Sequence, residues 1–350
     1  MSQPSGGVFL KLIGVATAAV GAAAMISTLR QVDEIGSEER RRNASSKAAA
    51  SSSSCCGSSG SSSASSAYVT QGSDPATNPY ETQQSVHEYL LMHFGAEAEL
   101  LNFPKLQGEQ MKDSISFPLQ CAQRAAHYVQ STALFASLPA SELRALDVGC
   151  AVGRSSFELT RWFGSVIGLD YSQAFVDAAN VLKRDGQMPY SMRVEGDIQQ
   201  NAVARVNPEL DCSRVRFVQG DACALSLDAL GGKRFHLLLA ANLLCRLPFP
   251  RRFLAALPGL IEAQGFVVLP SPYTWLEQYT PKSEWIGGVV DAETGKPRRS
   301  FDELRSIMEA DGHFRFVEAI DMPFFIRETA RKNQWSVAHT TVWVRTNTKA

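Results

Sequence analysis

The stretch ALDVGCAVGRSSFEL, residues 145–159, joins an apolar run to two glycines four residues apart and then to a polar, amphipathic segment. A strand that stops at a glycine turn and leads directly into a helix leaves backbone N–H groups free at the start of the helix. Nucleotide-like ligands bind at such places. The stretch therefore predicts a ligand site around Asp147, Gly149 and Gly153.

The spacing of the small residues separates two kinds of ligand. A dinucleotide-binding turn needs G-x-G-x-x-G, but counting from Gly149 those positions hold Gly149, Ala151 and Arg154. Arginine is too large where the third glycine lets helix and strand pack closely, so NAD is disfavoured. The order Asp147-x-Gly149-x-Ala151-x-Gly153 instead resembles the first motif of S-adenosylmethionine-dependent methyltransferases, with Ala in place of the middle glycine. In that motif the acidic residue and the backbone approach the amino-acid part of the cofactor.

Two further carboxylates follow the next strands. Asp170 ends SVIGLD, where a carboxylate can accept both ribose hydroxyls; a helix cap before Ser172 is the alternative. Asp221, in QGDAC, resembles the acidic residue that accepts the adenine amino group, with Ala222 offering a backbone N–H; an ordinary loop turn is the alternative. Open parallel sheets bind ligands at the edge where strand carboxyl ends meet. The expected cofactor-binding residues are Asp147, Gly149, Ala151, Gly153, Arg154, Asp170, Tyr171, Asp221 and Ala222.

The elements around these residues alternate between strand and helix. Near-continuous apolar runs predict strands at residues 143–148, 165–170, 214–218, 235–241 and 265–270. Periodicity predicts helices at 154–163, after Ser172 and at 251–263, where Pro258 bends or breaks the helix. Such alternation predicts a parallel sheet covered by helices on both faces.

The flanks of this region complete the layout. Residues 78–135 predict a helical N-terminal cap, with one helix that ends at Gly95 and another at 118–135. Ser300-Phe301-Asp302-Glu303 predicts a capping box that opens a helix, and residues 314–320 and 336–344 predict an antiparallel pair at the sheet edge. Five parallel strands with a terminal hairpin are the layout of class I methyltransferases. We therefore expect an α/β, Rossmann-like fold with S-adenosylmethionine as cofactor.

The composition limits which classes of partner, such as nucleic acids or metal ions, the sequence supports. The chain has 350 residues, 45% of them hydrophobic, and a formal net charge of −1, which gives no electrostatic argument for a nucleic-acid partner. Its seven cysteines are scattered, with no C-x-x-C and no Cys/His ligand spacing. We expect buried, reduced thiols and no metal site.

The first 75 residues differ from the rest. Residues 12–29 carry no charge and just reach the length that spans a bilayer, between Lys11 and Arg30. A signal anchor, a cleaved targeting peptide and a weakly structured apolar arm stay open for residues 1–30. Residues 31–75 contain a Ser/Ala-rich run and predict a disordered linker ahead of a methyltransferase domain at 76–350. The domain is expected to face the cytosol, or an organelle interior supplied with the cofactor, and to be membrane-associated only through residues 12–29.

A set of motifs resembles one methyltransferase family. They are NPYET (78–82), LDVGCAVGRSSFEL (146–159), GLDYSQAFVDAA (168–179), RVRFVQGDAC (214–223), AANLLCRLP (240–248), SPYTWLEQYTP (271–281), DMPFFIRE (321–328) and ARKNQWSVAHTTVW (330–343). Together they cover residues 76–346 and resemble the 4-mercaptohistidine (5-thiohistidine) N1-methyltransferase of ovothiol biosynthesis, also found as the C-terminal domain of ovothiol synthase. The resemblance implies methylation of the imidazole of 5-thiohistidine to give ovothiol A. No segment resembles the iron-dependent half that installs sulfur, so the resemblance implies a substrate supplied by a separate sulfoxide synthase or lyase.

Such a substrate carries a carboxylate, an ammonium and a thiol, which arginine, aromatic and carboxamide side chains suit. Asn242 follows the fourth strand, where polar groups face the substrate; a strand-end turn is its alternative. Arg246 could hold a carboxylate or be a surface charge. Tyr273 and Trp275 follow the fifth strand and either wall the pocket or belong to the core.

Residues 321–335 are long for a hairpin connection and predict a lid over the site. Within it, Arg327 is the expected carboxylate clamp and Trp335 a further candidate for the substrate site; a surface helix is the alternative, which would explain the charges of the segment but not Trp335 beside them. Asn78 and Tyr80 are expected to close the site from the N-terminal side. His339 alternates with apolar residues and is expected to be a packed histidine rather than a base.

Alignment of donor and acceptor is the main requirement of an in-line methyl transfer, so a general base is optional and no catalytic base is assigned. Two other functions stay open: a methyltransferase for another small amine or thiol, and a non-catalytic binding module with the same fold. The presence of Asp147, Gly149, Gly153, Asp170 and Asp221 argues against the second.

Overall fold

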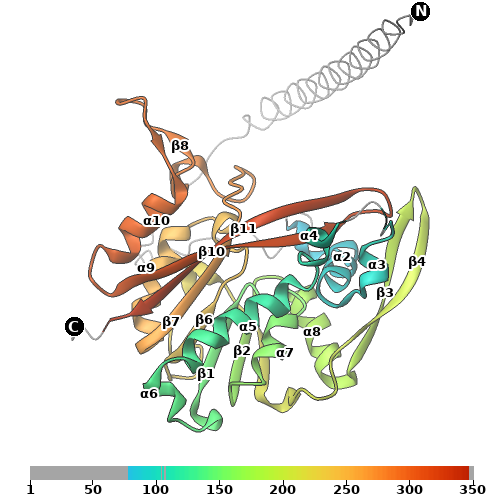
Figure 1. The fold of residues 1–350 in the computed structure, drawn as a ribbon, viewed down its shortest axis with the longest axis horizontal. Helices are drawn as coiled ribbons and strands as arrows, with labels where there is room; N and C mark the ends of the chain where they lie inside the picture. Colours follow the sequence, from blue (N-terminus) through green and yellow to red (C-terminus); the bar gives the residue numbers. More distant parts are fainter. Residues whose placement is uncertain (1–77, 104, 106–107, 347–350) are drawn as a thin grey trace, which may run out of the picture. The chain divides into compact units, whose positions relative to one another are not determined.

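A computed structural model of the protein describes residues 78–103, 105 and 108–346. The predicted segments at residues 1–30 and 31–75 lie outside this range. A seven-stranded sheet has the order β10-β11-β7-β6-β1-β2-β5 (Figure 1). Its parallel strands are β1 (Arg144–Val148), β2 (Ser165–Asp170), β5 (Val215–Gln219), β6 (Phe235–Leu239) and β7 (Ile261–Ser271). With the antiparallel β10 and β11 at one edge, this is the predicted class I methyltransferase fold.

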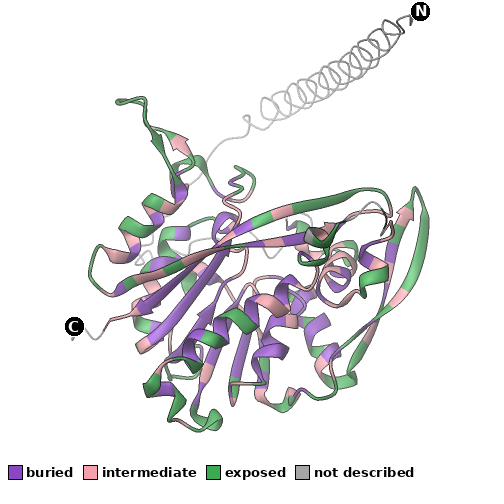
Figure 2. Ribbon diagram, viewed as in Figure 1, coloured by how far each residue is buried: buried purple, intermediate pink, exposed green. Residues whose placement is uncertain are grey.

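Helices cover both faces of the sheet, as the apolar strands require. One face carries α5 (Phe117–Gln130), α7 (Arg154–Leu159) and α8 (Gln173–Asp185), and the other carries α9 (Pro250–Leu260) and α10 (Ser300–Glu309). Successive side chains of a strand point to opposite faces, so Ala145 of β1 packs on the α5 side while Leu146 and Val148 pack on the α9 side. Figure 2 shows the resulting buried layer along the sheet.

The N-terminal cap comprises η1 (Pro79–Glu81), α2 (Gln83–Phe94), α3 (Glu97–Leu100) and α4 (Glu109–Lys112). Two further short helices, α6 (Ala133–Ala136) and η2 (Ala140–Glu142), lead into β1 and lie at the amino ends of the strands, where Ala140 O accepts from the Gly164 amide just before β2 (Figure 1). As predicted, α2 ends at Gly95. The cap is fixed to the start of α8, because the Ser172 hydroxyl donates to Tyr80 O (3.1 Å) and the Glu81 carboxylate accepts from the amides of Gln173 and Ala174.

The C-terminal hairpin is longer than predicted. Strands β10 (Phe314–Arg327) and β11 (Asn333–Arg345) pair along their length, but only residues 339–344 of β11 also pair with β7. The remaining part of the hairpin, residues 322–338, pairs only with itself and forms a two-stranded arm. The predicted lid at 321–335 is therefore wrong: cross-strand pairing continues through it, and only residues 328–332 connect the strands. Burial of Phe324 against Phe117 (ring centroids 5.2 Å apart) stabilises the extended form.

The sequence patterns gave no indication of a second hairpin between α8 and β5. Strands β3 (Gln187–Glu195) and β4 (Ile198–Arg205) pair with each other outside the main sheet, and Tyr190 and Met192 of β3 are buried. The arm reaches this hairpin, since the Ala330 amide donates to Val194 O (3.1 Å). A third, two-residue pair joins β8 (Val289–Val290) and β9 (Pro297–Arg298).

Several predicted boundaries need correction. The helix predicted at 154–163 ends at Leu159, and the helix at 251–263 ends two residues after Pro258, at Leu260. The capping box at 300–303 is wrong. Arg299 is the N-cap residue, and the Ser300 hydroxyl accepts from Trp275 Nε1 (2.9 Å) instead of capping the helix.

Short 3-10 turns connect the remaining elements: η3 (Cys212–Arg214), η4 (Ala222–Ala224), η5 (Leu244–Arg246) and η6 (Lys282–Glu284). Within the described ranges, no helix is both long enough and apolar enough to cross a membrane. Residues 12–29 are outside those ranges.

Two glycines, Gly153 and Gly168, lie against the Phe217 ring, and only one of them also has a left-handed backbone. A Cβ at Gly153 would lie 2.6 Å from Phe217 Cζ, and the residue also has a φ of +87°. A Cβ at Gly168 would lie 2.6 Å from Phe217 Cδ1, with no positive φ. We predict that Gly153→Ala lowers the free energy of unfolding by about 2–5 kcal/mol and Gly168→Ala by about 1–3 kcal/mol, measured by urea denaturation.

A Phe217→Leu background separates the two causes. Relative to that single variant, Gly168→Ala should lose the part of its cost that comes from the Phe217 ring and keep the part that comes from Ser156 Oγ, 2.7 Å from the added Cβ. Gly153→Ala should retain about 1–2 kcal/mol from its left-handed backbone. Equal rescue of both glycine variants would contradict this account of the turn.

Candidate functional site

The turn after β1 is left-handed at three positions. Gly149, Ala151 and Gly153 have φ values of 74°, 47° and 87°. The left-handed conformation costs a residue with a Cβ roughly 1–2 kcal/mol, so Ala151 is held there by its surroundings. A Cβ at Gly149 would lie 3.0 Å from the Leu243 side chain. The loop after β6 thus contacts the turn after β1, at the point where the strand order of the sheet reverses.

Backbone hydrogen bonds attach this turn to the end of β2. The amides of Gly149 and Cys150 donate to Leu169 O at 2.7 and 3.1 Å. The Ala151 amide donates to Asp170 Oδ2 at 2.8 Å. The first motif and the second predicted carboxylate therefore form one structural unit.

Asp170 binds backbone amides on both sides and retains capacity for a ligand. Its Oδ1 accepts from the Ser172 amide (2.9 Å), while Oδ2 takes the Ala151 amide. The N-cap of α8 is Ser172, whose hydroxyl accepts from the Phe175 amide, so the alternative of Asp170 as the helix cap is wrong. Burial raises the pKa of Asp170 to about 6 against the effect of the Ser172 and Ala151 amides, and Asp147 and Glu81 raise it further. Each carboxylate oxygen has two lone pairs, so both oxygens can also accept a hydroxyl. The Asp170 carboxylate can therefore keep its two backbone hydrogen bonds and also bind ribose hydroxyls.

Asp147 lies deeper than the turn. It is 1% exposed, and its Oδ2 accepts from the hydroxyls of Ser155 (2.7 Å) and Ser156 (2.6 Å) in α7. Burial raises the pKa of Asp147 to about 6, and the Ser156 and Ser155 hydrogen bonds oppose the shift. These contacts give Asp147 a role in holding the start of α7 beneath the turn.

The third carboxylate lies at the same edge. Asp221 follows β5, and its Oδ1 accepts from the Cys223 amide (2.7 Å), so the predicted loop turn is present. Ala222 is buried beside it. Burial raises the pKa of Tyr171, and the charges of Asp221 and Glu81 raise it further.

Arg154 points toward the cap. Its Nε donates to Glu158 (2.9 Å), its Nη1 donates to His93 O (3.2 Å), and its guanidinium lies 5.4 Å from the centre of the Phe94 ring. The contacts join α7 to α2. These contacts occupy the Arg154 side chain, which the sequence predicts to bind the cofactor.

Asn242 has two unusual properties. It follows β6 with a φ of +54°, and its amide donates to Pro270 O (2.8 Å). Its Oδ1 is buried and accepts no hydrogen bond from the residues that the structure describes. A buried acceptor without a donor costs about 1–3 kcal/mol, which a ligand N–H would recover.

Tyr279 brings two other predicted residues together. The Arg246 guanidinium lies 4.9 Å from the centre of the Tyr279 ring, and the Tyr80 ring stacks on Tyr279 with centroids 6.0 Å apart. Asn78 is adjacent: its Oδ1 accepts from the Tyr80 amide (3.1 Å). Sequence reasoning missed Tyr279; its signal was its place in SPYTWLEQYTP, after the last parallel strand.

Other predicted substrate residues lie elsewhere. Trp275 is 7% exposed and stacks on Trp285, so it belongs to the core. The Tyr273 hydroxyl hydrogen-bonds His339 Nδ1 (3.0 Å), which agrees with a packed His339. Trp335 is on the arm and 46% exposed.

Arg327 is not a lid clamp. It is 3% exposed and donates to Asn102 Oδ1 (2.9 Å) and to Glu99 O. The guanidinium thereby ties the arm to the cap. The prediction that Arg327 clamps a substrate carboxylate in a lid is wrong, because Arg327 belongs to the paired strand β10.

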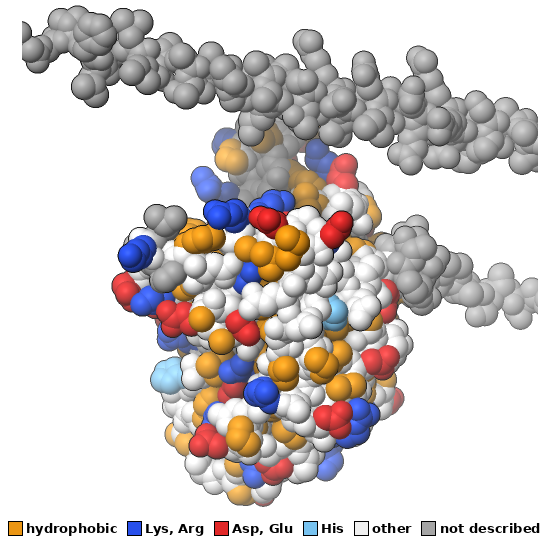
Figure 3. Space-filling view, turned by 90° about the vertical axis from the view of Figure 1, so that its right-hand side faces the viewer, with side chains coloured by type: hydrophobic (Ala, Val, Ile, Leu, Met, Phe, Trp, Pro, Cys, Tyr) orange, Lys and Arg blue, Asp and Glu red, His pale blue; other side chains and the backbone are white. Residues whose placement is uncertain are grey.

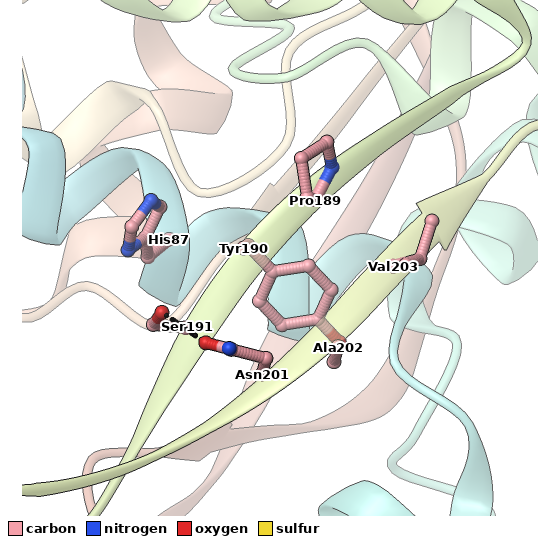
Figure 4. Close-up of a pocket in the computed structure, with 7 residues that line it drawn as sticks. All are labelled: His87, Pro189, Tyr190, Ser191, Asn201, Ala202 and Val203. Carbon is pink, nitrogen blue, oxygen red and sulfur yellow. Dashed lines mark hydrogen bonds between the residues drawn. The ribbon is translucent and has the colours of Figure 1, made fainter.

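A separate hollow of about 340 Å³ lies between α2 and the β3–β4 hairpin (Figure 4). His87, Tyr190, Ser191 and Asn201 are among its lining residues, and Ser191 donates to Asn201 Oδ1 (2.9 Å). None of the strand-end carboxylates lines it. On the outer face that includes this hairpin, basic and acidic side chains are interspersed among the described residues (Figure 3).

Comparison with known proteins agrees with the fold. Residues 146–269 match a family model described as a methyltransferase domain. Among solved structures, the chain is similar to magnesium protoporphyrin IX methyltransferase of Synechocystis PCC 6803 with bound SAH, at 16% identity over 77% of this chain and 97% of that chain, with a TM-score of 0.46. It is also similar to a SAM-dependent methyltransferase of Methanosarcina mazei, at 17% identity over 61% and 98%, with a TM-score of 0.37. No curated protein matches the chain.

The family match covers β1 to β7, the part of the chain that carries the left-handed turn and all three carboxylates. The chain is a methyltransferase enzyme, and its cofactor is S-adenosylmethionine. The described site has a carboxylate at the end of β2, another after β5, and small residues at the three left-handed positions of the turn after β1.

We predict that cofactor affinity depends on pH through Asp170. Ribose hydroxyls donate to the ionised carboxylate, and the pKa of this group is about 6 without cofactor. The dissociation constant of S-adenosylhomocysteine should therefore rise as the pH falls through 6, by up to about tenfold per pH unit. Calorimetric titration of the full chain between pH 5 and about pH 8 measures this.

Asp170→Asn is the matched variant. At about pH 8 it should bind roughly 30-fold to several hundred-fold more weakly, since it loses charge-assisted bonds, and its affinity should change little with pH. The same pH profile in both proteins would rule out Asp170 as the titrating ribose ligand.

Proposed function

We propose that this enzyme transfers the methyl group of S-adenosylmethionine to a ring nitrogen of 5-thiohistidine and forms ovothiol A. One observation carries the proposal: segments that resemble the ovothiol family meet at one place. The segments 78–82, 240–248 and 271–281 supply Tyr80, Arg246 and Tyr279, and Tyr279 contacts both of the others. If the resemblance to the family were accidental, the resembling segments would not be expected to meet at a single acceptor site.

In this proposal the strand ends hold the cofactor. Asp170 would bind the ribose hydroxyls, Asp221 the adenine amino group, and the turn from Gly149 to Gly153 the amino-acid part. When bound, the cofactor supplies an electrophilic methyl group on a sulfonium. The protein's remaining task is to align an acceptor lone pair with that group.

Asn242 is suited to orient the acceptor ring. A neutral imidazole has one N–H and one nitrogen with a lone pair. The buried, unpartnered Oδ1 of Asn242 would accept the ring N–H, which fixes the other nitrogen as nucleophile. The ring N–H proton can leave after the transfer, so no strong base is required. A methyltransferase for another small amine or thiol remains the second candidate, since Asn242 would accept from other N–H donors.

The supply of the acceptor belongs to the same proposal. A separate sulfoxide synthase or lyase would produce the thiohistidine. Residues 12–29 would place the domain at a membrane facing the cytosol, or would address it to an organelle that contains the cofactor.

Incubation of the full chain with methyl-labelled cofactor tests this function, with 5-thiohistidine, histidine and a panel of small amines and thiols as acceptors. We predict labelled N-methyl thiohistidine as the main product. Asn242→Ala should lower kcat/KM about 10- to 100-fold through the lost ring hydrogen bond. Asn201→Ala, on the exposed β4 strand, is the control and should keep wild-type kinetics. Absence of any methylated imidazole would reject the substrate assignment.

A further inference from the structure

Four side chains from separate segments form a tyrosine–arginine cluster: Tyr80 of η1, Tyr89 of α2, Tyr279 after β7 and Arg246 of η5. The Tyr80 ring lies 6.0 Å from the Tyr89 ring, edge to face, and 6.0 Å from the Tyr279 ring, stacked. Arg246 covers the Tyr279 ring at 4.9 Å. The cap and the loops after β6 and β7 therefore meet through these side chains.

Burial keeps the hydroxyls of Tyr80 and Tyr89 protonated at neutral pH. Burial raises the pKa of Tyr80, and the adjacent Tyr89 and Tyr279 raise it further, while Arg246 opposes the shift. Burial raises the pKa of Tyr89 to about 12, and the nearby Asp170 charge contributes. The cluster is linked to the proposed ribose site through Ser172, whose hydroxyl donates to Tyr80 O and whose amide donates to Asp170 Oδ1.

Arg246 retains unused donors. Its Nη1 donates to Thr274 O (2.7 Å) and to Cys245 O (3.0 Å), and its Nη2 donates to Thr274 Oγ1 (3.1 Å). A guanidinium has five N–H groups, so these bonds leave the Nε–H and one Nη2–H without an acceptor in the described part of the chain. The Thr274 contacts orient the group so that a second acceptor can bind two donors at once.

An independent donor lies next to Tyr80. Asn78 Nδ2 is buried and has no hydrogen-bond acceptor among the described residues, although Oδ1 of the same side chain caps η1. The Tyr80 hydroxyl is hydrogen-bonded within the cluster to the hydroxyls of Tyr279 and Tyr89. The two guanidinium N–H groups and the Asn78 amide remain as donors without an acceptor in the part of the chain that the structure describes, beside one positive charge, and an anion would satisfy them.

We propose that the tyrosine–arginine cluster is an anion subsite that binds the carboxylate of the methyl acceptor, with the carboxylate on the Nε and Nη2 edge of Arg246 and against the hydroxyl of Tyr279. The identity of that acceptor rests on the proposed function, but the subsite itself does not. It restricts acceptors to small free acids. A histidine within a peptide has no carboxylate next to its ring-bearing residue and is excluded.

Two imidazoles test the subsite without any methyl transfer. The full chain saturated with S-adenosylhomocysteine is titrated by calorimetry with imidazole propionate, which has a carboxylate, and with 4-methylimidazole, which has none. We expect wild type to bind imidazole propionate at least about tenfold more tightly. Arg246→Met should remove most of this preference, and Tyr279→Phe should reduce it severalfold.

Two matched variants provide controls. Arg305→Met removes a surface guanidinium that lies 4.9 Å over the Phe316 ring, and Tyr190→Phe removes a hydroxyl that donates to Glu99; both should keep the preference. No preference in wild type, or one that survives both cluster variants, overturns the proposal. Weaker S-adenosylhomocysteine binding with the preference intact also overturns it, because the cluster would then hold the cofactor's carboxylate. A clear preference without methylation of thiohistidine supports the subsite and rejects only the proposed substrate.

Discussion

The attachment of the turn after β1 to the end of β2 is the constraint on which the site depends. Leu169 O and the Asp170 carboxylate take the amides of Gly149, Cys150 and Ala151. To make these bonds the chain must enter the left-handed region three times, and it must leave room for the Phe217 ring at Gly153. In return, the turn, the Asp170 carboxylate and the start of α8 are fixed relative to one another before any ligand binds.

The acceptor side of the site is built by different means. The Ser172 hydroxyl and the Glu81 carboxylate hold the cap at the start of α8, and the arm holds the cap through Arg327. Tyr80 is thereby placed against Tyr279 and Arg246, which come from the loops after β7 and β6. Asp170 belongs to both halves, since it accepts from the Ala151 amide of the turn and from the amide of Ser172, whose hydroxyl donates to Tyr80 O. One carboxylate thus connects the proposed cofactor and acceptor sites.

The sequence predicts the parts of the molecule whose signals are local. The inner parallel strands β1 and β2 are near-continuous apolar runs that are buried along most of their length, and Asp147, Asp170 and Asp221 stand at or just after strand ends. The sequence does not predict the β3–β4 hairpin because few of its side chains are buried (Tyr190, Met192 and Ala204) and most of β4 is exposed. Arg327 was assigned wrongly because its charged, aromatic segment resembles a loop in composition, while its structure is set by pairing with Asn333 across the arm. Tyr279 and Ser300 depend on long-range contacts that no local pattern encodes.

Hydrogen exchange of the full chain with and without S-adenosylhomocysteine tests the central claim, that the cofactor binds where these strand ends meet. The account predicts slower exchange at the amides of residues 147–154, 170–174 and 219–224 when the ligand is bound, and no change in the β3–β4 hairpin at 187–205. Slower exchange confined to that hairpin, or unchanged exchange at all three strand ends under saturating ligand, would contradict the account.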